Sequence, residues 1–140
     1  MTEDSLNRIG GGLGITVPAA YRDLMLARGA EFRTSQLDHW FWAHPNRVII
    51  SNLEERPRPW RWSDPGGTAG AYPQWWKEYF LIGDNGDCEF FCLRLDGDPA
   101  VYKIGSDDDG PEKIADSLAG FLEYDLVRER LKPREKPPAE

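Results

Sequence analysis

Hydrophobic and polar residues alternate in short blocks over residues 79–121. The chain there reads YFLIGDNGDCEFFCLRL, then PAVYKI, then the acidic turn SDDDGPE, and finally IADSLAGF. Tyr79–Ile82 and Glu89–Leu95 are predicted strands, because Asn85-Gly86 between two apolar runs is a strong hairpin signal. Ala100–Ile104 is a third predicted strand. The pattern therefore predicts an antiparallel meander.

Helical periodicity marks both ends of the chain. Residues 3–10 fit a short first helix, which the following Gly10–Gly12 is expected to end, because glycine disfavours helix. A second helix is predicted from Pro18 to Arg28, with the proline in its first turn and Gly29 as its stop. The last helix is expected to open at Asp109-Gly110-Pro111-Glu112. Its buried stripe would consist of Ile114, Leu118, Phe121 and Leu122.

The middle of the chain has a mixed pattern. Residues 31–50 contain an aromatic run, Trp40–Trp42, and a β-branched run, Val48–Ile50, which both favour strands. Ser51-Asn52-Leu53-Glu54 fits a capping box and predicts the start of a short helix. Residues 57–73 are rich in Pro, Gly, Arg and Trp, the composition of a long surface loop.

These elements predict one α+β domain over residues 1–131, with a central antiparallel meander-like sheet bracketed by helices, and a disordered tail over 132–140. A chain of 140 residues can bury a core without disulfides or metals. The net charge of -7 argues against a nucleic-acid partner, and fits either a cationic partner or simple solubility. Because no apolar run is long enough to span a bilayer, and MTEDSLNRIG has no signal-peptide pattern, we expect a cytoplasmic protein with no membrane partner.

The two cysteines are expected to be free thiols. Cys88 and Cys92 fall in a predicted strand, where they would lie about 13 Å apart. That distance exceeds the limit of about 7 Å for a disulfide. Two lone cysteines also lack the spacing of a structural zinc site, so the sequence predicts thiols packed among aromatic rings.

The residue types that support catalysis or metal binding do not form a known pattern. The cluster Asp107–Asp109 does not fit a calcium loop, because Pro111 and Glu112 would occupy its fifth and sixth positions. His39 and His44 match no metalloenzyme signature. A Cys–His pair assembled by the fold stays open, since such residues meet only in three dimensions. We therefore expect no catalytic residue, no metal and no cofactor.

Cationic and aromatic residues alternate in one stretch of the predicted loop: Arg56, Arg58, Trp60, Arg61 and Trp62. Such a stretch can stack on nucleic-acid bases. In an acidic chain, Trp rings that pack on the protein body under Arg stems are the better account. Trp and Arg are also enriched at interface hot spots, so a protein contact is favoured over nucleic acid.

Taken in order, these segments resemble the SUKH superfamily, which joins a cell-wall synthesis regulator family to many bacterial immunity proteins. The resemblance covers the chain from about Leu6 to Leu122. It is carried by the step from Leu13-Gly14 to Val17-Pro18 with Tyr21 and Leu24, the segment Val48 to Arg56, the block YFLIGDNGDCEFFCLRL, Ala100-Val101-Tyr102, and Ile114-Ala115-Asp116-Ser117-Leu118 with Phe121-Leu122. The triple glycine and the long Trp/Arg/Pro loop depart from the pattern.

The resemblance implies an α+β fold and a non-enzymatic role. Bacterial members neutralise a toxin, often a nuclease, which is delivered by a competing cell or made by the same cell. The family has no catalytic residues to carry over. The matched residues Gly86, Pro18, Phe121 and Leu122 look structural, at a turn, at a helix start and in the core.

Nuclease toxins hold phosphates in cationic clefts, so an acidic surface is suited to occupy such a cleft and to accelerate association. The expected partner is a cognate toxin with a basic surface, and the expected oligomeric state is a monomer or weak homodimer. Two alternatives stay open: a regulatory interaction module of the same fold without a toxin partner, and a small metal-dependent hydrolase. The residues predicted to bind the partner are Asp84, Asp87, Asp107, Asp108 and Asp109, with Trp60, Trp62 and Trp76 as anchors.

Overall fold

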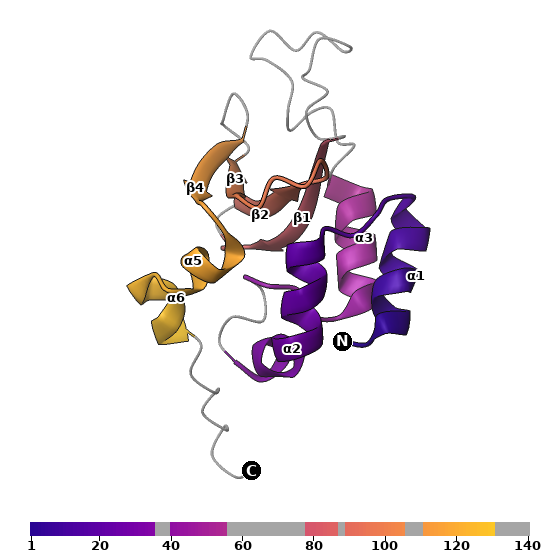
Figure 1. Ribbon diagram of the computed structural model, residues 1–140, viewed down its shortest axis with the longest axis horizontal. Helices are drawn as coiled ribbons and strands as arrows, with labels where there is room; N and C mark the ends of the chain where they lie inside the picture. Colours follow the sequence, from indigo (N-terminus) through magenta and orange to yellow (C-terminus); the bar gives the residue numbers. More distant parts are fainter. Residues whose placement is uncertain (36–39, 56–77, 87–88, 106–110, 131–140) are drawn as a thin grey trace, which may run out of the picture.

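The computed structural model describes residues 1–35, 40–55, 78–86, 89–105 and 111–130. Within these ranges, helices precede and follow a four-stranded sheet (Figure 1). The helices are α1 (Glu3–Leu13), α2 (Ala19–Thr34), α3 (Pro45–Glu55), α5 (Leu118–Leu122) and α6 (Asp125–Arg130). The strands are β1 (Tyr79–Asp84), β2 (Glu89–Arg94), β3 (Val101–Gly105) and β4 (Glu112–Ala115). The predicted α+β class is confirmed.

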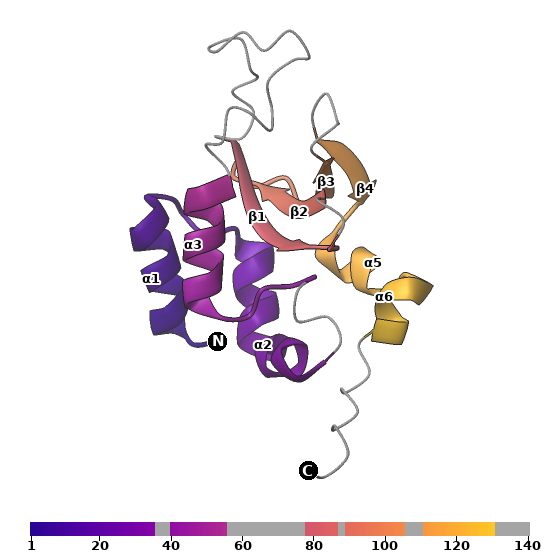
Figure 2. The same cartoon turned by 180° about the vertical axis from the view of Figure 1, so that it is seen from behind.

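The sheet is an antiparallel meander, as predicted, but it has a fourth strand, β4, where the sequence predicts the start of a helix. Its strand order is β1-β2-β3-β4, and each strand pairs with its neighbours in sequence. The turn after β1 places Gly86 at φ 84, a conformation that glycine adopts without strain. From behind, α1, α2 and α3 gather on the β1 side of the molecule, whereas α5 and α6 lie on the β4 side (Figure 2).

The prediction that glycines end the first helix was wrong. α1 runs through Gly10–Gly12 and ends at Leu13, and Gly14 follows as its C-cap with a φ of 66. Leu6 and Ile9 on its inner face are completely buried. Their packing outweighs the helix cost of about 1 kcal/mol for each glycine.

Replacing Gly11 with alanine is expected to stabilise the protein. Gly11 is exposed, and a Cβ added there meets no atom within 4 Å. Because alanine is the better helix former, urea unfolding should show a free energy of unfolding larger by about 0.5–1 kcal/mol. The control Gly14→Ala, at a left-handed position, should lower it instead. A loss in Gly11→Ala would contradict the helical assignment of this segment.

The expected stop of the second helix at Gly29 was also wrong, although Pro18 does precede its first turn. α2 continues through Gly29 to Thr34. Gly29 is buried, and a Cβ added there would lie 3.1 Å from the backbone nitrogen of Met1. The glycine is therefore explained by the close approach of the N-terminus and not by a helix end.

Residues 45–55 form one helix, so the strand predicted at Val48–Ile50 was wrong, and the helix predicted to start at Ser51 begins earlier. Val48–Ile50 lies in the middle of α3, and Ser51 lies within the helix instead of starting it. Val48 is completely buried, whereas Ile50 is 52% exposed. Burial of one face of the helix outweighs the preference of these β-branched residues for a strand.

The helix predicted to open at residues 109–112 begins only at Leu118, because residues 112–115 form β4. Glu112 belongs to β4, and α5 starts at Leu118, where the Ser117 hydroxyl accepts a hydrogen bond from the Gly120 N–H at 3.0 Å. The predicted apolar stripe is thus divided between the two elements. Ile114 lies on β4, whereas Leu118, Phe121 and Leu122 are buried on α5.

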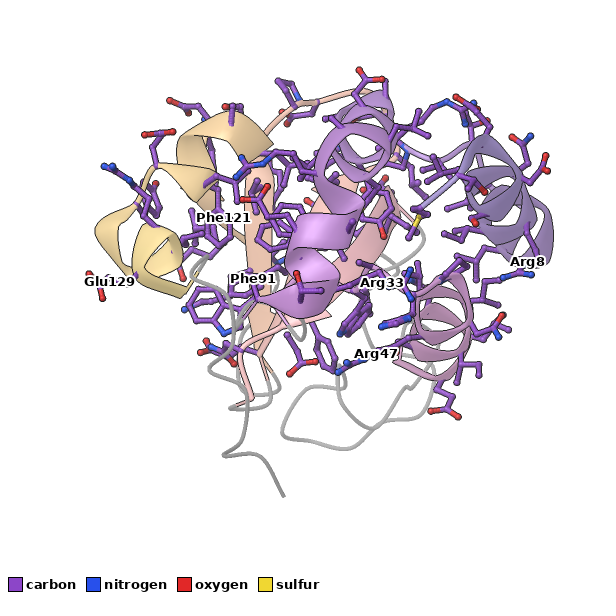
Figure 3. The ribbon with its side chains drawn as sticks, turned by 90° about the horizontal axis from the view of Figure 1, so that it is seen from below. Arg8, Arg33, Arg47, Phe91, Phe121 and Glu129 are labelled. Atoms are coloured by element: carbon purple, nitrogen blue, oxygen red, sulfur yellow. The ribbon has the colours of Figure 1, made fainter. Side chains whose placement is uncertain are left out.

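Aromatic rings fill the core between the sheet and the helices. Tyr21 of α2 packs edge-on against Phe80, with ring centroids 5.2 Å apart. Phe91 and Phe121 point toward each other between β2 and α5 (Figure 3), with centroids 5.2 Å apart. Cys92 is a buried free thiol, as predicted, and burial raises its pKa. Cys88 lies outside the described residues.

Side chains and one backbone group hydrogen-bond to the outer strands of the sheet, β1 and β4. The Asn52 amide of α3 donates to the Leu81 carbonyl and accepts from the Leu81 N–H, each at 2.9 Å. The backbone N–H of Trp42 donates to the Ile82 carbonyl at 2.8 Å. On β4, the Tyr124 hydroxyl donates to the Ile114 carbonyl. These bonds occupy backbone groups that an outer strand would otherwise offer to another chain.

Candidate partner-binding surface

Asp84, at the end of β1, is held by bonds within the molecule. One carboxylate oxygen accepts from the Gly86 N–H at 2.9 Å, and the other accepts from Trp42 Nε1 at 3.2 Å. An Arg47 guanidinium nitrogen lies 3.8 Å from the second oxygen, and the Asp84 side chain is 25% exposed. Asp84 therefore fixes the hairpin turn and the Trp42 ring, and only a small part of it faces outward.

The other residues predicted to bind the partner lie outside the described ranges, so their role stays a prediction. The predicted surface loop over 57–73 and the tail over 132–140 lie there as well. The predicted partner-binding residues outside the described ranges are Asp87, Asp107, Asp108, Asp109, Trp60, Trp62 and Trp76.

The described residues that flank the predicted acidic segments meet at one end of the sheet. In an antiparallel meander, the β1–β2 and β3–β4 connections leave from the same end. The register places Glu89 opposite Gly105, and Glu112 opposite Lys103. The Lys103 ammonium lies 2.9 Å from Glu89 and 3.9 Å from Glu112. Two carboxylates around one lysine leave this end with a negative charge.

Hydrogen bonds define the electrostatics of this end. The Lys103 ammonium, and after it the Asn85 amide, hold the pKa of Glu89 below its usual value. The Asn85 side chain donates to Glu89 at 2.8 Å, and the Asn85 N–H donates to the Glu89 carbonyl at 3.1 Å. Glu89 is therefore a fixed negative charge, whereas Glu112 is 68% exposed and free to contact a partner.

The acids at the opposite end of the sheet stabilise a turn. Arg94 donates to Asp96 at 2.8 Å and holds the pKa of Asp96 below its usual range. Asp98 accepts from the Ala100 N–H and from the Tyr102 hydroxyl, both at 2.9 Å, and the first of these bonds contributes most to its lowered pKa. The sequence marks this segment only as a turn, and the use of both carboxylates within it is visible only in the structure.

The chemistry of the reactive side chains is limited by burial. Tyr21 donates its hydroxyl to the Trp42 carbonyl at 2.7 Å, and burial raises its pKa far above the usual value. His44 is exposed at the start of α3, and His39 lies outside the described residues.

In the part of the chain that the structure describes, no three His, Cys, Asp or Glu side chains gather as a metal site. None of the helices found there is both long and apolar enough to cross a membrane.

Two surface grooves were missed by the sequence analysis. One, of about 490 Å³, lies between α1 and α2 beside Gly10 and Gly11. The other, of about 430 Å³, lies between α2 and α5, with Leu24 on one wall and Leu122 on the other. Because the walls of the second groove come from residues about 100 positions apart, only the fold brings them together.

Comparison with known proteins identifies one family. The family model described as SMI1 / KNR4 family (SUKH-1) matches residues 1–124. This range contains every described element from α1 to α5. Comparisons with curated proteins and with solved structures gave no match.

Proposed function

Because this chain belongs to the SMI1 / KNR4 family (SUKH-1), we propose that it is a non-enzymatic immunity protein. It binds and neutralises a cognate bacterial toxin, with a nuclease or another toxin with a cationic cleft as its target. The observation that supports this proposal best is the negative end of the sheet around Glu89 and Glu112. The segments that contain Asp87 and Asp107–Asp109 begin and end beside it.

The proposed mechanism is electrostatic and steric. A cleft that binds nucleic acid carries Lys and Arg side chains, and an acidic surface pairs with them while it blocks access of the substrate. Trp60, Trp62 and Trp76 would supply apolar anchors for the partner. Asp84 contributes by fixing the turn next to Asp87, because its own oxygens are already hydrogen-bonded.

The proposal is tested with the toxin domain encoded next to this gene. Co-expression of the protein should restore growth, and the purified pair should form a complex. Reversing the charge at Asp107–Asp109 to lysine should slow association about tenfold or more at low salt, with a smaller difference at high salt. The matched control reverses three charges elsewhere, at Asp4, Asp116 and Glu129, and should change association by less than about threefold.

The possible failures are distinguishable. Unchanged affinity and salt dependence in the Asp107–Asp109 variant would contradict the acidic surface but not the immunity role. Failure of the unmodified protein to bind or neutralise the toxin would contradict the immunity role. In that case the regulatory interaction module would be the better account.

A further inference from the structure

The groove between α2 and α5 has an apolar floor. It is formed by Ala20 and Leu24 of α2 and by Leu118, Ala119 and Leu122 of α5. Leu118 and Leu122 are each 4% exposed, so their packing fixes the shape of the floor. A volume of about 430 Å³ is within the range of sites that take several apolar groups.

The rim of this groove is negatively charged. Asp23 on α2 and Glu123 after α5 are both exposed. Arg28, the cation of the rim, makes two hydrogen bonds to Glu31, at 2.9 and 2.8 Å. The bonds to Glu31, and more weakly the charge of Glu123, raise the pKa of Arg28. The two carboxylates and one guanidinium that line the groove give its rim a net negative charge of one, and the guanidinium is itself paired with Glu31, which is not part of the lining.

We propose that this groove binds a helical segment of a partner protein, with apolar side chains in the groove and Lys or Arg side chains facing Asp23 and Glu123. This inference rests on the proposed function only for the identity of the partner, which would be the toxin. Charge complementarity selects the cationic segment. A second copy of this chain is disfavoured, because a symmetric contact would bring two negative rims together.

The walls of the groove favour a helix as the bound segment. Most of the lining comes from α2 and α5, and none of it from a strand, so an extended segment would find no strand edge to pair with. Ala20, Leu24 and Arg28 follow one another at intervals of four residues along about 12 Å of α2. An amphipathic helix of about two turns presents side chains with the same spacing.

A designed peptide tests the groove directly. The probe is a fluorescein-labelled helix of about 18 residues, with Leu along one face and Lys along the other. It should bind the unmodified protein, and amide shifts should map to α2 and α5. The variant Asp23→Lys/Glu123→Lys should weaken binding about tenfold or more, and Ala119→Trp, which fills the groove, should weaken it similarly. The same peptide with Glu in place of Lys should not bind.

The matched control reverses two exposed charges away from the groove and from the acidic end of the sheet, Asp4→Lys/Glu54→Lys. It should leave the affinity for the peptide within about twofold. Equal losses in this control and in the groove variants would overturn the proposal, because they would show a general attraction between opposite charges. Amide shifts that map to another surface would overturn it as well.

The toxin provides the second arm of the experiment. Weaker toxin binding by Asp23→Lys/Glu123→Lys and by Ala119→Trp, with the control unchanged, would support the groove. Full toxin binding and protection by both groove variants would overturn it, while the proposed function would stand. If the unmodified protein gave no protection but still bound the peptide in the groove, the proposed function would fail and the groove would remain supported.

Discussion

Replacing Asn52 with leucine is expected to lower the free energy of unfolding by about 2–5 kcal/mol. Asn52 is 1% exposed, and its amide satisfies both the N–H and the carbonyl of Leu81 at 2.9 Å. Leucine has a similar size but no polar atom, so two backbone groups on the buried side of β1 lose their partners. Each such group costs about 1–3 kcal/mol when left unsatisfied.

Urea unfolding, followed by Trp fluorescence, measures this loss. The control is Asn46→Leu, an exposed asparagine on the same helix, which should change the free energy of unfolding by no more than about 0.5 kcal/mol. If Asn52→Leu cost less than about 1 kcal/mol, or no more than this control, the role of Asn52 as the partner of β1 would be contradicted.

The first three strands could be predicted because their signals are local, whereas β4 was predicted as part of a helix. Tyr79–Ile82 was predicted and Tyr79–Asp84 is observed, and the second strand differs from its prediction only by Leu95. Asn85-Gly86 defines the turn between them, with Gly86 at a positive φ. A hairpin whose turn and alternation agree can be read from a few neighbouring residues.

The third helix could not be predicted because its cause is not local. Val48–Ile50 has high strand propensity, yet it lies in α3. The pairing of Asn52 with Leu81, 29 residues away, and the burial of Val48 hold this segment as a helix against β1. Neither contact can be recognised from the neighbouring residues, so the prediction of a strand from β propensity was wrong.

Only the sign of the charge on the candidate partner-binding surface could be predicted from the sequence. The acidic turns and the net charge of -7 indicate a negative surface, but not which carboxylates are free. Asp84, Asp96 and Asp98 accept hydrogen bonds within their own turns or from Trp42. The negative charge that is free on the described surface is therefore set by fewer acids than the composition suggests. It is also set by groups such as Asp23 and Glu123, which no motif marks.

Replacing Gly83 with alanine is expected to destabilise the protein by more than about 4 kcal/mol, because steric overlap in a core is among the most damaging changes. Gly83 is buried on β1, beside the bulge at which its pairing with β2 shifts. A Cβ added there would overlap the carbonyl group of Trp40 and lie 3.0 Å from the Phe41 nitrogen. These are backbone atoms, tied to β1 by the bond from the Trp42 N–H to the Ile82 carbonyl, so they cannot turn aside as a flexible side chain would.

Thermal unfolding followed by circular dichroism distinguishes this overlap from a general effect of replacing glycine. Gly83→Ala should melt far below the unmodified protein or fail to fold at all. Gly86→Ala, where a Cβ meets no atom within 4 Å but φ is 84, should cost only about 1 kcal/mol, the cost of a positive φ alone. A Gly83→Ala protein as stable as Gly86→Ala would contradict the close passage of residues 40–42 across β1. If instead only Gly83→Ala fails to fold, the contact of residues 40–42 with β1 is required for folding. This contact joins the aromatic core to β1, the strand that leads to the acidic end of the sheet.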